Sequence, residues 1–105
     1  MKKYQIVLML CSVIFVCCGP SERALRIAKL SGEEENGEPL YNDLCSRCHG
    51  LDGRGGKGAN LIKHRSHHDD AELIDSVIEG GGGMPSFRSL EDQELADIVR
   101  YIRTL

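Results

Sequence analysis

The stretch that decides the fold is Cys45-Ser46-Arg47-Cys48-His49, near the middle of a chain of 105 residues. On a helix, residues i and i+3 project from the same face, so both sulfurs would meet the same side of a ligand. His49 follows directly and can turn its imidazole toward the centre of that ligand. Cys-x-x-Cys-His is the attachment signature of c-type haem, in which two thiols bond to the vinyl groups of a porphyrin. The stretch therefore predicts one covalent haem on Cys45 and Cys48, with His49 as an axial ligand of the iron.

A second axial ligand is predicted from the only methionine after residue 18. A low-spin electron carrier needs such a ligand, usually a Met thioether or another His. Met84 follows four glycines, Gly80 to Gly83, which allow the backbone to approach a flat ring closely. Pro85 then disfavours helical geometry at Met84. Met84 is thus the predicted ligand, and three histidines are the alternatives: His64, His67 and His68.

Composition supports a small domain filled by a cofactor. The chain has 12 glycines, five aromatic residues and no tryptophan, which is little core material for its length. A haem would supply the missing apolar mass. One domain of this size excludes a multidomain enzyme, and a net charge of −3 disfavours binding to a nucleic-acid backbone.

Hydrophobic spacing predicts an all-α fold of three to four short helices wrapped around the haem. One helix is expected over residues 39–48, with Pro39 in its first turn and Gly50 beyond its end. A second is capped by Asp69 or Asp70 and ends at the glycines from 80 onward. A third is capped by Ser89 and runs to the C-terminus. Residues 50–63 are expected to form a loop.

The N-terminus predicts export. Lys2 and Lys3 precede an apolar run from Ile6 to Cys18, the layout of a secretory signal peptide over residues 1–18. At about 1.5 Å per residue the run spans roughly 20 Å, short of the ~30 Å hydrocarbon core. Its end is similar to a bacterial lipoprotein signal, with Cys17 or Cys18 as the acylated residue. The chain is therefore expected in the periplasm, soluble or tethered to the membrane, with residues 19–37 as a flexible acidic tether and 38–105 as the folded domain.

Other sites can be built from the same cysteines. Cys45 and Cys48, with His64 and His68, match the spacing of a two-Cys, two-His zinc site. A thioredoxin-like redox pair also uses Cys-x-x-Cys, but it needs strands that the pattern does not contain. Zinc would leave residues 70–105 without a role, so haem explains more of the chain.

Residues 37 to 105 resemble the class I cytochromes c of the small, bacterial, single-haem kind. The resemblance implies that helices 39–48 and 90–104 cross near Tyr101, and that the haem lies between Cys48 and Met84. The family usually has a proline whose carbonyl accepts the N–H of the axial histidine. This chain has Ala59 at that point, and its carbonyl can still accept the bond. The motifs carrying the resemblance are Leu40-Tyr41, Cys45 to Gly50, Asp52 to Gly55, Gly83 to Phe87 and Val99 to Ile102.

The expected function is single-electron transfer and not catalysis, because six-coordinate iron has no open site for a substrate. The partners are a redox donor and acceptor. The alternative is a haem-bearing accessory subunit of a larger oxidoreductase or oxidase complex. Four basic residues in a stretch without acids could steer an acidic partner, or they are ordinary solvated charges. They are Arg54, Lys57, Lys63 and Arg65.

Overall fold

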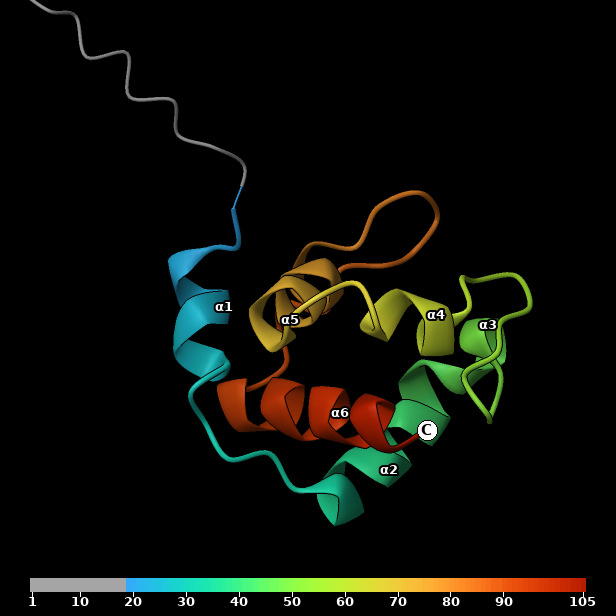
Figure 1. The fold of residues 1–105 in the computed structure, drawn as a ribbon, viewed down its shortest axis with the longest axis horizontal. Coiled ribbons are helices and arrows are strands. Elements are labelled where there is room, and N and C mark those ends of the chain that lie inside the picture. Colours follow the sequence, from blue (N-terminus) through green and yellow to red (C-terminus); the bar gives the residue numbers. More distant parts are fainter. Residues whose placement is uncertain (1–18) are drawn as a thin grey trace, which may run out of the picture.

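The computed structural model describes residues 19–105, and within them every regular element is a helix (Figure 1). The predicted all-α fold is confirmed, with six helices in place of three to four. The predicted signal peptide, with Cys17 and Cys18, lies outside the described residues. The helices are α1 (Glu22–Ile27), α2 (Glu34–Leu44), α3 (Ser46–His49), α4 (Leu61–Arg65), α5 (Asp70–Glu79) and α6 (Asp92–Thr104).

The central contact is the crossing of α2 with α6, as the resemblance implied (Figure 1). Gly37 allows this approach, because a Cβ there would strike the backbone carbonyl of Asp97 and come within 3.0 Å of the Tyr101 Cβ. The rings of Tyr41 and Tyr101 pack at the crossing, with centroids 5.3 Å apart. Ile98 and Ile102 of α6 complete this buried cluster with Tyr41.

The helix predicted over residues 39–48 is wrong at both ends. It starts five residues earlier, at Glu34. The carboxylates in its first turn are stabilised by the positive end of the helix dipole. Pro39 therefore lies inside α2 and not in its first turn. At the other end, Cys45 separates α2 from α3, with φ −116° and ψ −35°.

Residues 21–28 are packed against the domain, so the prediction of a flexible tether over residues 19–37 is wrong for this part. The side chains of Ala24 and Ile27 are fully buried against α5 and α6. The Ser21 hydroxyl caps α1, and its backbone N–H donates to Asp75 of α5 at 3.2 Å. The acidic composition of this segment suggested a solvated linker, but the apolar pair Ala24 and Ile27 is enough to hold α1 on the domain.

Arg23 fastens this N-terminal helix to the segment before α6. Its guanidinium forms an ion pair with Asp92 at 2.9 Å and donates to the backbone carbonyls of Arg88 and Leu90, each at 2.8 Å. The folded domain therefore begins at about Ser21 and not at residue 38.

The helix caps are partly as predicted. Asp69 caps α5 in a reciprocal capping box with Glu72. For α6 the cap is Glu91, paired with Glu94, and not Ser89. The expected loop over 50–63 ends in an unpredicted helix, α4, where the N–H groups of Ile62 and Lys63 donate to the side chain of Asn60. None of the helices in residues 19–105 is long and apolar enough to cross a membrane.

Candidate functional site

One cavity of about 650 Å³ collects all four predicted site residues: Cys45, Cys48, His49 and Met84. It is bordered by α3, α4, α5 and the loop between α5 and α6. Figure 1 shows α3 and α4 on the right and the loop above them. Apolar side chains make up most of the remaining wall: Leu44, Leu61, Leu73, Val77, Phe87 and Ile102.

The two cysteines lie three residues apart, with Cys45 at the N-cap of α3 and Cys48 within the helix. Cys45 is 6% exposed, Cys48 is half-buried, and both are free thiols. Burial, followed by the proximity of Cys48, raises the pKa of Cys45 to about 11. Burial therefore favours the protonated form of the Cys45 thiol before a haem is attached.

His49 is buried and its ring orientation is set by the backbone. Its Nδ1 lies 2.8 Å from the carbonyl oxygen of Ala59, so Nδ1–H donates and Nε2 keeps the free lone pair. The hydrogen bond expected from Ala59, in place of the usual proline, is confirmed. An imidazole held in this way is preset as a nitrogen ligand.

Gly58 allows that orientation, and the sequence reasoning missed it. A Cβ at Gly58 would lie 2.8 Å from both Cε1 and Nδ1 of His49, closer than real Cβ contacts. The only signal in the sequence was its place directly before Ala59.

We expect G58A to displace the His49 ring and to lower the free energy of unfolding by about 1–3 kcal/mol, the usual cost of overpacking. Denaturant unfolding of the haem-loaded protein measures this. The matched control is G56A in the same loop, where a Cβ would meet only the Cys48 carbonyl at 3.2 Å. Equal losses from the two variants would contradict a specific role for Gly58.

Met84 lies on a strap, residues 80–87, that is tied to α5. Gly81 and Met84 exchange backbone hydrogen bonds of 2.8 and 3.0 Å, which close a tight turn. Phe87 N–H donates to Val77, and the Ser86 hydroxyl donates to the carbonyl of Ile78 at 2.6 Å. These bonds hold Met84 beside the cavity.

Gly80 is required where the strap leaves α5. Its φ is +68°, and a Cβ there would lie 2.6 Å from the carbonyl oxygens of Met84 and Pro85. A side chain at this position would therefore push the strap, and Met84 with it, away from the helix.

Tyr41 braces the attachment motif from behind. It is fully buried, and its hydroxyl donates to the carbonyl of Gly50 at 2.6 Å, which ties α2 to the end of α3. Burial, then the nearby Cys45, raises the pKa of Tyr41 to about 12. Tyr41 therefore positions the end of α3. The sequence analysis named it only as part of the family motif and gave it no role.

The three alternative histidines are placed differently. His64 lines the cavity, whereas His67 and His68 do not. Burial, followed by the proximity of His68, lowers the pKa of His64. His68 stacks on His64, with centroids 4.2 Å apart, and bonds to Glu72.

The zinc alternative finds no geometric support. Within residues 19–105, no group of three or more His, Cys, Asp and Glu side chains is close enough to hold a metal ion. Cys45 and Cys48 therefore do not form a four-ligand cluster with His64 and His68.

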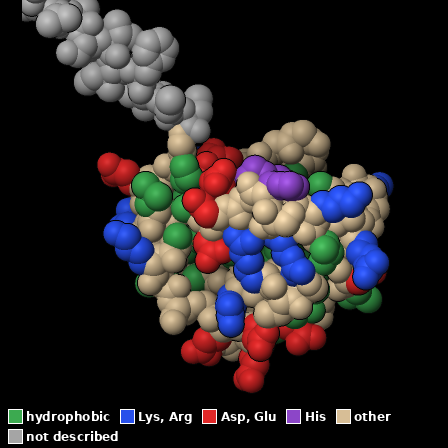
Figure 2. Space-filling model, viewed as in Figure 1, with side chains coloured by type: hydrophobic (Ala, Val, Ile, Leu, Met, Phe, Trp, Pro, Cys, Tyr) green, Lys and Arg blue, Asp and Glu red, His purple; other side chains and the backbone are tan. Residues whose placement is uncertain are grey.

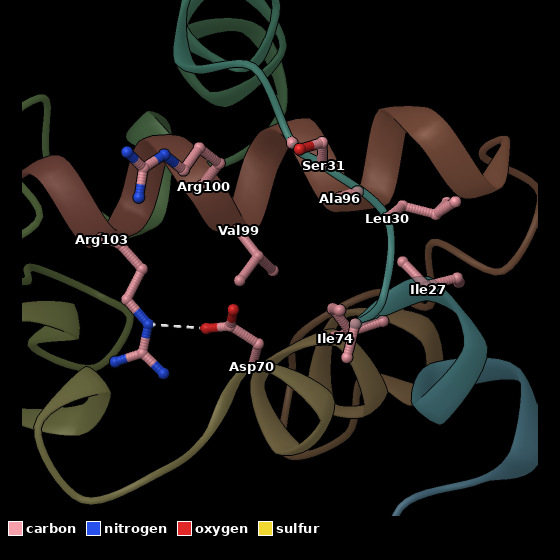
Figure 3. Close-up of a pocket in the computed structure, with 11 residues that line it drawn as sticks. Ile27, Leu30, Ser31, Asp70, Ile74, Ala96, Val99, Arg100 and Arg103 are labelled. Carbon is pink, nitrogen blue, oxygen red and sulfur yellow. Dashed lines mark hydrogen bonds and ion pairs between the residues drawn. The ribbon is translucent and has the colours of Figure 1, made fainter.

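A second cavity, of about 310 Å³, lies between the end of α1, α5 and α6 (Figure 3). Its wall contains no cysteine, histidine or methionine. Asp70 and Arg103 on its rim bond to each other at 2.8 Å, and Arg103 also donates to the carbonyls of Arg65 and His68. This cavity lacks the donor set of the first.

The predicted basic stretch is only partly available to a partner. Lys57 and Lys63 are exposed, and Lys57 borders the large cavity. Arg54 is exposed and lies 3.7 Å from Asp52. Arg65, in contrast, is half-buried and donates to the carbonyl of Ile102 at 2.7 Å, which holds α4 on α6.

The residues of the large cavity fit a covalent haem. Two free thiols one turn apart, an imidazole with a free Nε2, a thioether and an apolar wall are the groups that such a cofactor requires.

Known proteins with similar sequences carry the same group. The family model described as cytochrome c oxidase, cbb3-type, subunit III matches residues 32–102. Cytochrome c-551 of Bacillus subtilis is 30% identical over 95 residues, covering 87% of this chain and 84% of that protein. A cytochrome c-553-like protein of Synechocystis is 28% identical over 81 residues, 76% of each chain.

A solved structure agrees. Cytochrome cL from Hyphomicrobium denitrificans superimposes with a TM-score of 0.61 at 26% identity, over 79% of this chain and 51% of that one. The chain thus spans about half the length of that structure. By sequence and by fold, it belongs to the cytochrome c family as a small single-haem member that carries electrons on a covalent c-type haem.

Proposed function

We propose that the chain is an exported single-electron carrier, with haem bonded to Cys45 and Cys48 and its iron ligated by His49 and Met84. The observation that carries this proposal is that all four side chains border one largely apolar cavity. The bound haem would supply a one-electron Fe(III)/Fe(II) couple.

The chain's own residues would tune that couple. Ala59 accepts the Nδ1–H bond of His49 and so sets which nitrogen faces the metal. The apolar wall excludes water and, with a thioether ligand, favours the reduced state. With protein side chains on both sides of the iron, no coordination position is left for a substrate, which supports a carrier and not an enzyme.

The proposed location is the periplasm, either free or tethered to the membrane. The support is the sequence: two lysines before the apolar run from Ile6 to Cys18, and a cysteine at its end. Acylation at Cys17 or Cys18 would provide the tether.

A second candidate follows from the family description, which names a subunit of an oxidase. On this alternative, the chain is a haem-bearing subunit held permanently in a larger oxidoreductase. Extraction of the native membrane with mild detergent separates the two: a carrier, free or lipid-tethered, is recovered as a single chain, whereas a subunit stays with its complex.

The direct test is a mass spectrum and a haem stain of the exported protein after denaturation. A carrier of the proposed type keeps one haem on the unfolded chain, and its iron is reduced and reoxidised reversibly. A chain without bound colour would contradict the proposal.

The exposed lysines beside the cavity are proposed to attract an acidic redox partner. Lys57 borders the cavity, and Lys63 lies on α4, which forms part of its wall. Figure 2 shows Lys and Arg side chains across the centre and right of this view, with acidic side chains gathered along the lower edge.

We expect K57E/K63E to slow the oxidation of the reduced protein by ferricyanide about tenfold at low salt, because steering of an anion is lost. Stopped-flow absorbance measures the rate, and added salt should shrink the effect. The matched control is R26E/K29E, the same charge change at α1. Equal slowing by both pairs would contradict a local docking surface.

A further inference from the structure

We propose that the outer face of α1 rests on an anionic lipid surface. The face is formed by Leu25, Arg26 and Lys29, and it continues to Leu30. This inference rests on the membrane tether proposed above, and it adds an orientation that a tether alone does not provide.

Exposed apolar side chains concentrate at this helix. Within the described part of the chain, three large apolar residues are exposed, and two are here: Leu25 at 48% and Leu30 at 42%. Their neighbours Ala24 and Ile27 are fully buried on the other side of α1. Leu25 on α1 and Leu30 just beyond its end are therefore apolar side chains on the outer side of this segment, whose inner side packs on the domain.

The charge of this segment is opposite to that of the rest of the domain. Residues 21–30 contain three basic residues and one acid, whereas residues 31–105 contain eight basic and fifteen acidic residues. Arg23 is held in its ion pair with Asp92, but none of the ion pairs in the described chain includes Arg26 or Lys29. Both are exposed, and they lie on the same side of the helix as Leu25.

The position of the preceding chain selects a membrane as the occupant. The apolar run ends at Cys18, and Ser21, which caps α1, is the first anchored residue of the domain. Three residue steps reach at most about 11 Å, so anything that holds Cys18 in a bilayer holds α1 at its surface. The short link keeps α1 close to the headgroups, and because its inner face is packed on the domain, its outer face is the one available to meet them.

The physical chemistry favours this contact. A lipid on Cys17 or Cys18 would fix the end of the chain at the membrane without orienting the domain, and a basic patch adds a second membrane contact. Each Lys or Arg near an anionic surface adds to the attraction, and apolar side chains between them can enter the interface. Hydrophobic and basic side chains are visible at the left edge of Figure 2, where α1 lies in Figure 1.

The orientation has a consequence for the haem cavity. α1 and α3 lie at opposite ends of the domain in Figure 1, and the cavity is on the side of α3. A domain lying on α1 therefore presents Lys57 and the cavity to the aqueous side, where a partner can approach.

The test uses the haem-loaded protein as it is exported, with its N-terminus defined by mass. Its partition is measured on vesicles of equal parts phosphatidylcholine and phosphatidylglycerol, and on phosphatidylcholine alone. We expect R26Q/K29Q to lower binding to the anionic vesicles about 30-fold, from two basic contacts, and to leave binding to the neutral vesicles unchanged. L25S/L30S should lower binding to both.

Matched controls lie at the other end of the domain. K57Q/K63Q removes the same charge, and L51S removes the third exposed apolar side chain, which is 70% exposed. Neither control should change vesicle binding. In wild type, hydrogen exchange on anionic vesicles should be slowed in residues 22–30 and not in residues 51–63.

The proposal would be overturned if R26Q/K29Q bound anionic vesicles as tightly as the wild type, or if K57Q/K63Q lost as much binding. It would also be overturned if vesicles left hydrogen exchange in α1 unchanged. All variants should keep the haem absorption of the wild type, because the changed side chains are exposed and none of them belongs to the proposed haem ligands or thiols. A variant series that lacks haem from the start would instead reject the proposed function, so the two failures are distinguishable.

Discussion

C45S/C48S is expected to yield a chain that carries no covalent haem and does not fold. The cavity of about 650 Å³ between α3, α4, α5 and the strap would have nothing to fill it. Empty core volume costs about 24 cal/mol per Å³. The free-energy cost of leaving even half of that volume empty is comparable to the 5–15 kcal/mol by which a whole domain is stable. A haem stain after denaturation and far-ultraviolet circular dichroism measure the two losses.

The single variants sharpen this test. C45S and C48S each leave one thiol, so each should hold haem through one thioether and fold with lower stability. S46A/R47Q changes the two residues between the cysteines, neither of which lines the cavity, and it should keep its colour. A helical, soluble C45S/C48S chain without haem would show that the protein fills its own core, and it would contradict the proposed site.

M84A is expected to abolish the weak red-end absorbance of a ferric haem with thioether ligation and to lower the reduction potential. The choice of axial ligands varies haem reduction potentials over roughly 0.8 V. Removing the thioether should lower the potential by on the order of 0.1–0.3 V. Optical redox titration of the exported protein measures both changes.

Two further substitutions separate ligation from packing. M84L keeps the volume that packs against the buried cluster of α1, α5 and α6 but removes the sulfur. It should therefore lose the red-end band while keeping most of the stability. M84H restores a strong ligand and should recover a low-spin spectrum at a lower potential. Persistence of the red-end band in M84L would exclude Met84 as the ligand, and His64, which also lines the cavity, would be tested next.

The four candidate site residues could be selected from local sequence features, whereas the helix boundaries around them could not. The attachment motif is local, so its residue types and spacing carry its chemistry. Met84 followed by elimination, because no other methionine lies beyond residue 18. The Ala59 carbonyl was predicted because any residue offers one. Only the family resemblance pointed to the crossing of α2 with α6.

The errors arose where a tertiary contact overrides local composition. Residues 19–37 look like a solvated linker, but Arg23 reaches a residue 69 positions away and closes α1 onto the domain. Pro39 is typical of a first turn, yet the crossing at Gly37 requires helix before it. α4 has five residues and is too short for a periodic pattern, and its hold on α6 through Arg65 is visible only in three dimensions.

The crossing at Gly37 also dictates an order of events in biosynthesis. α2 precedes the two cysteines, but it packs against α6, the last of the described helices in chain order. During synthesis or export from the N-terminus, α6 therefore becomes available after α2 and the cysteines. Until then α2 has no partner to close on, and the thiols at its end remain open to a porphyrin. When the final 14 residues pack on α2, they would complete the wall around the attached haem. α6 is therefore the helix whose docking closes the domain.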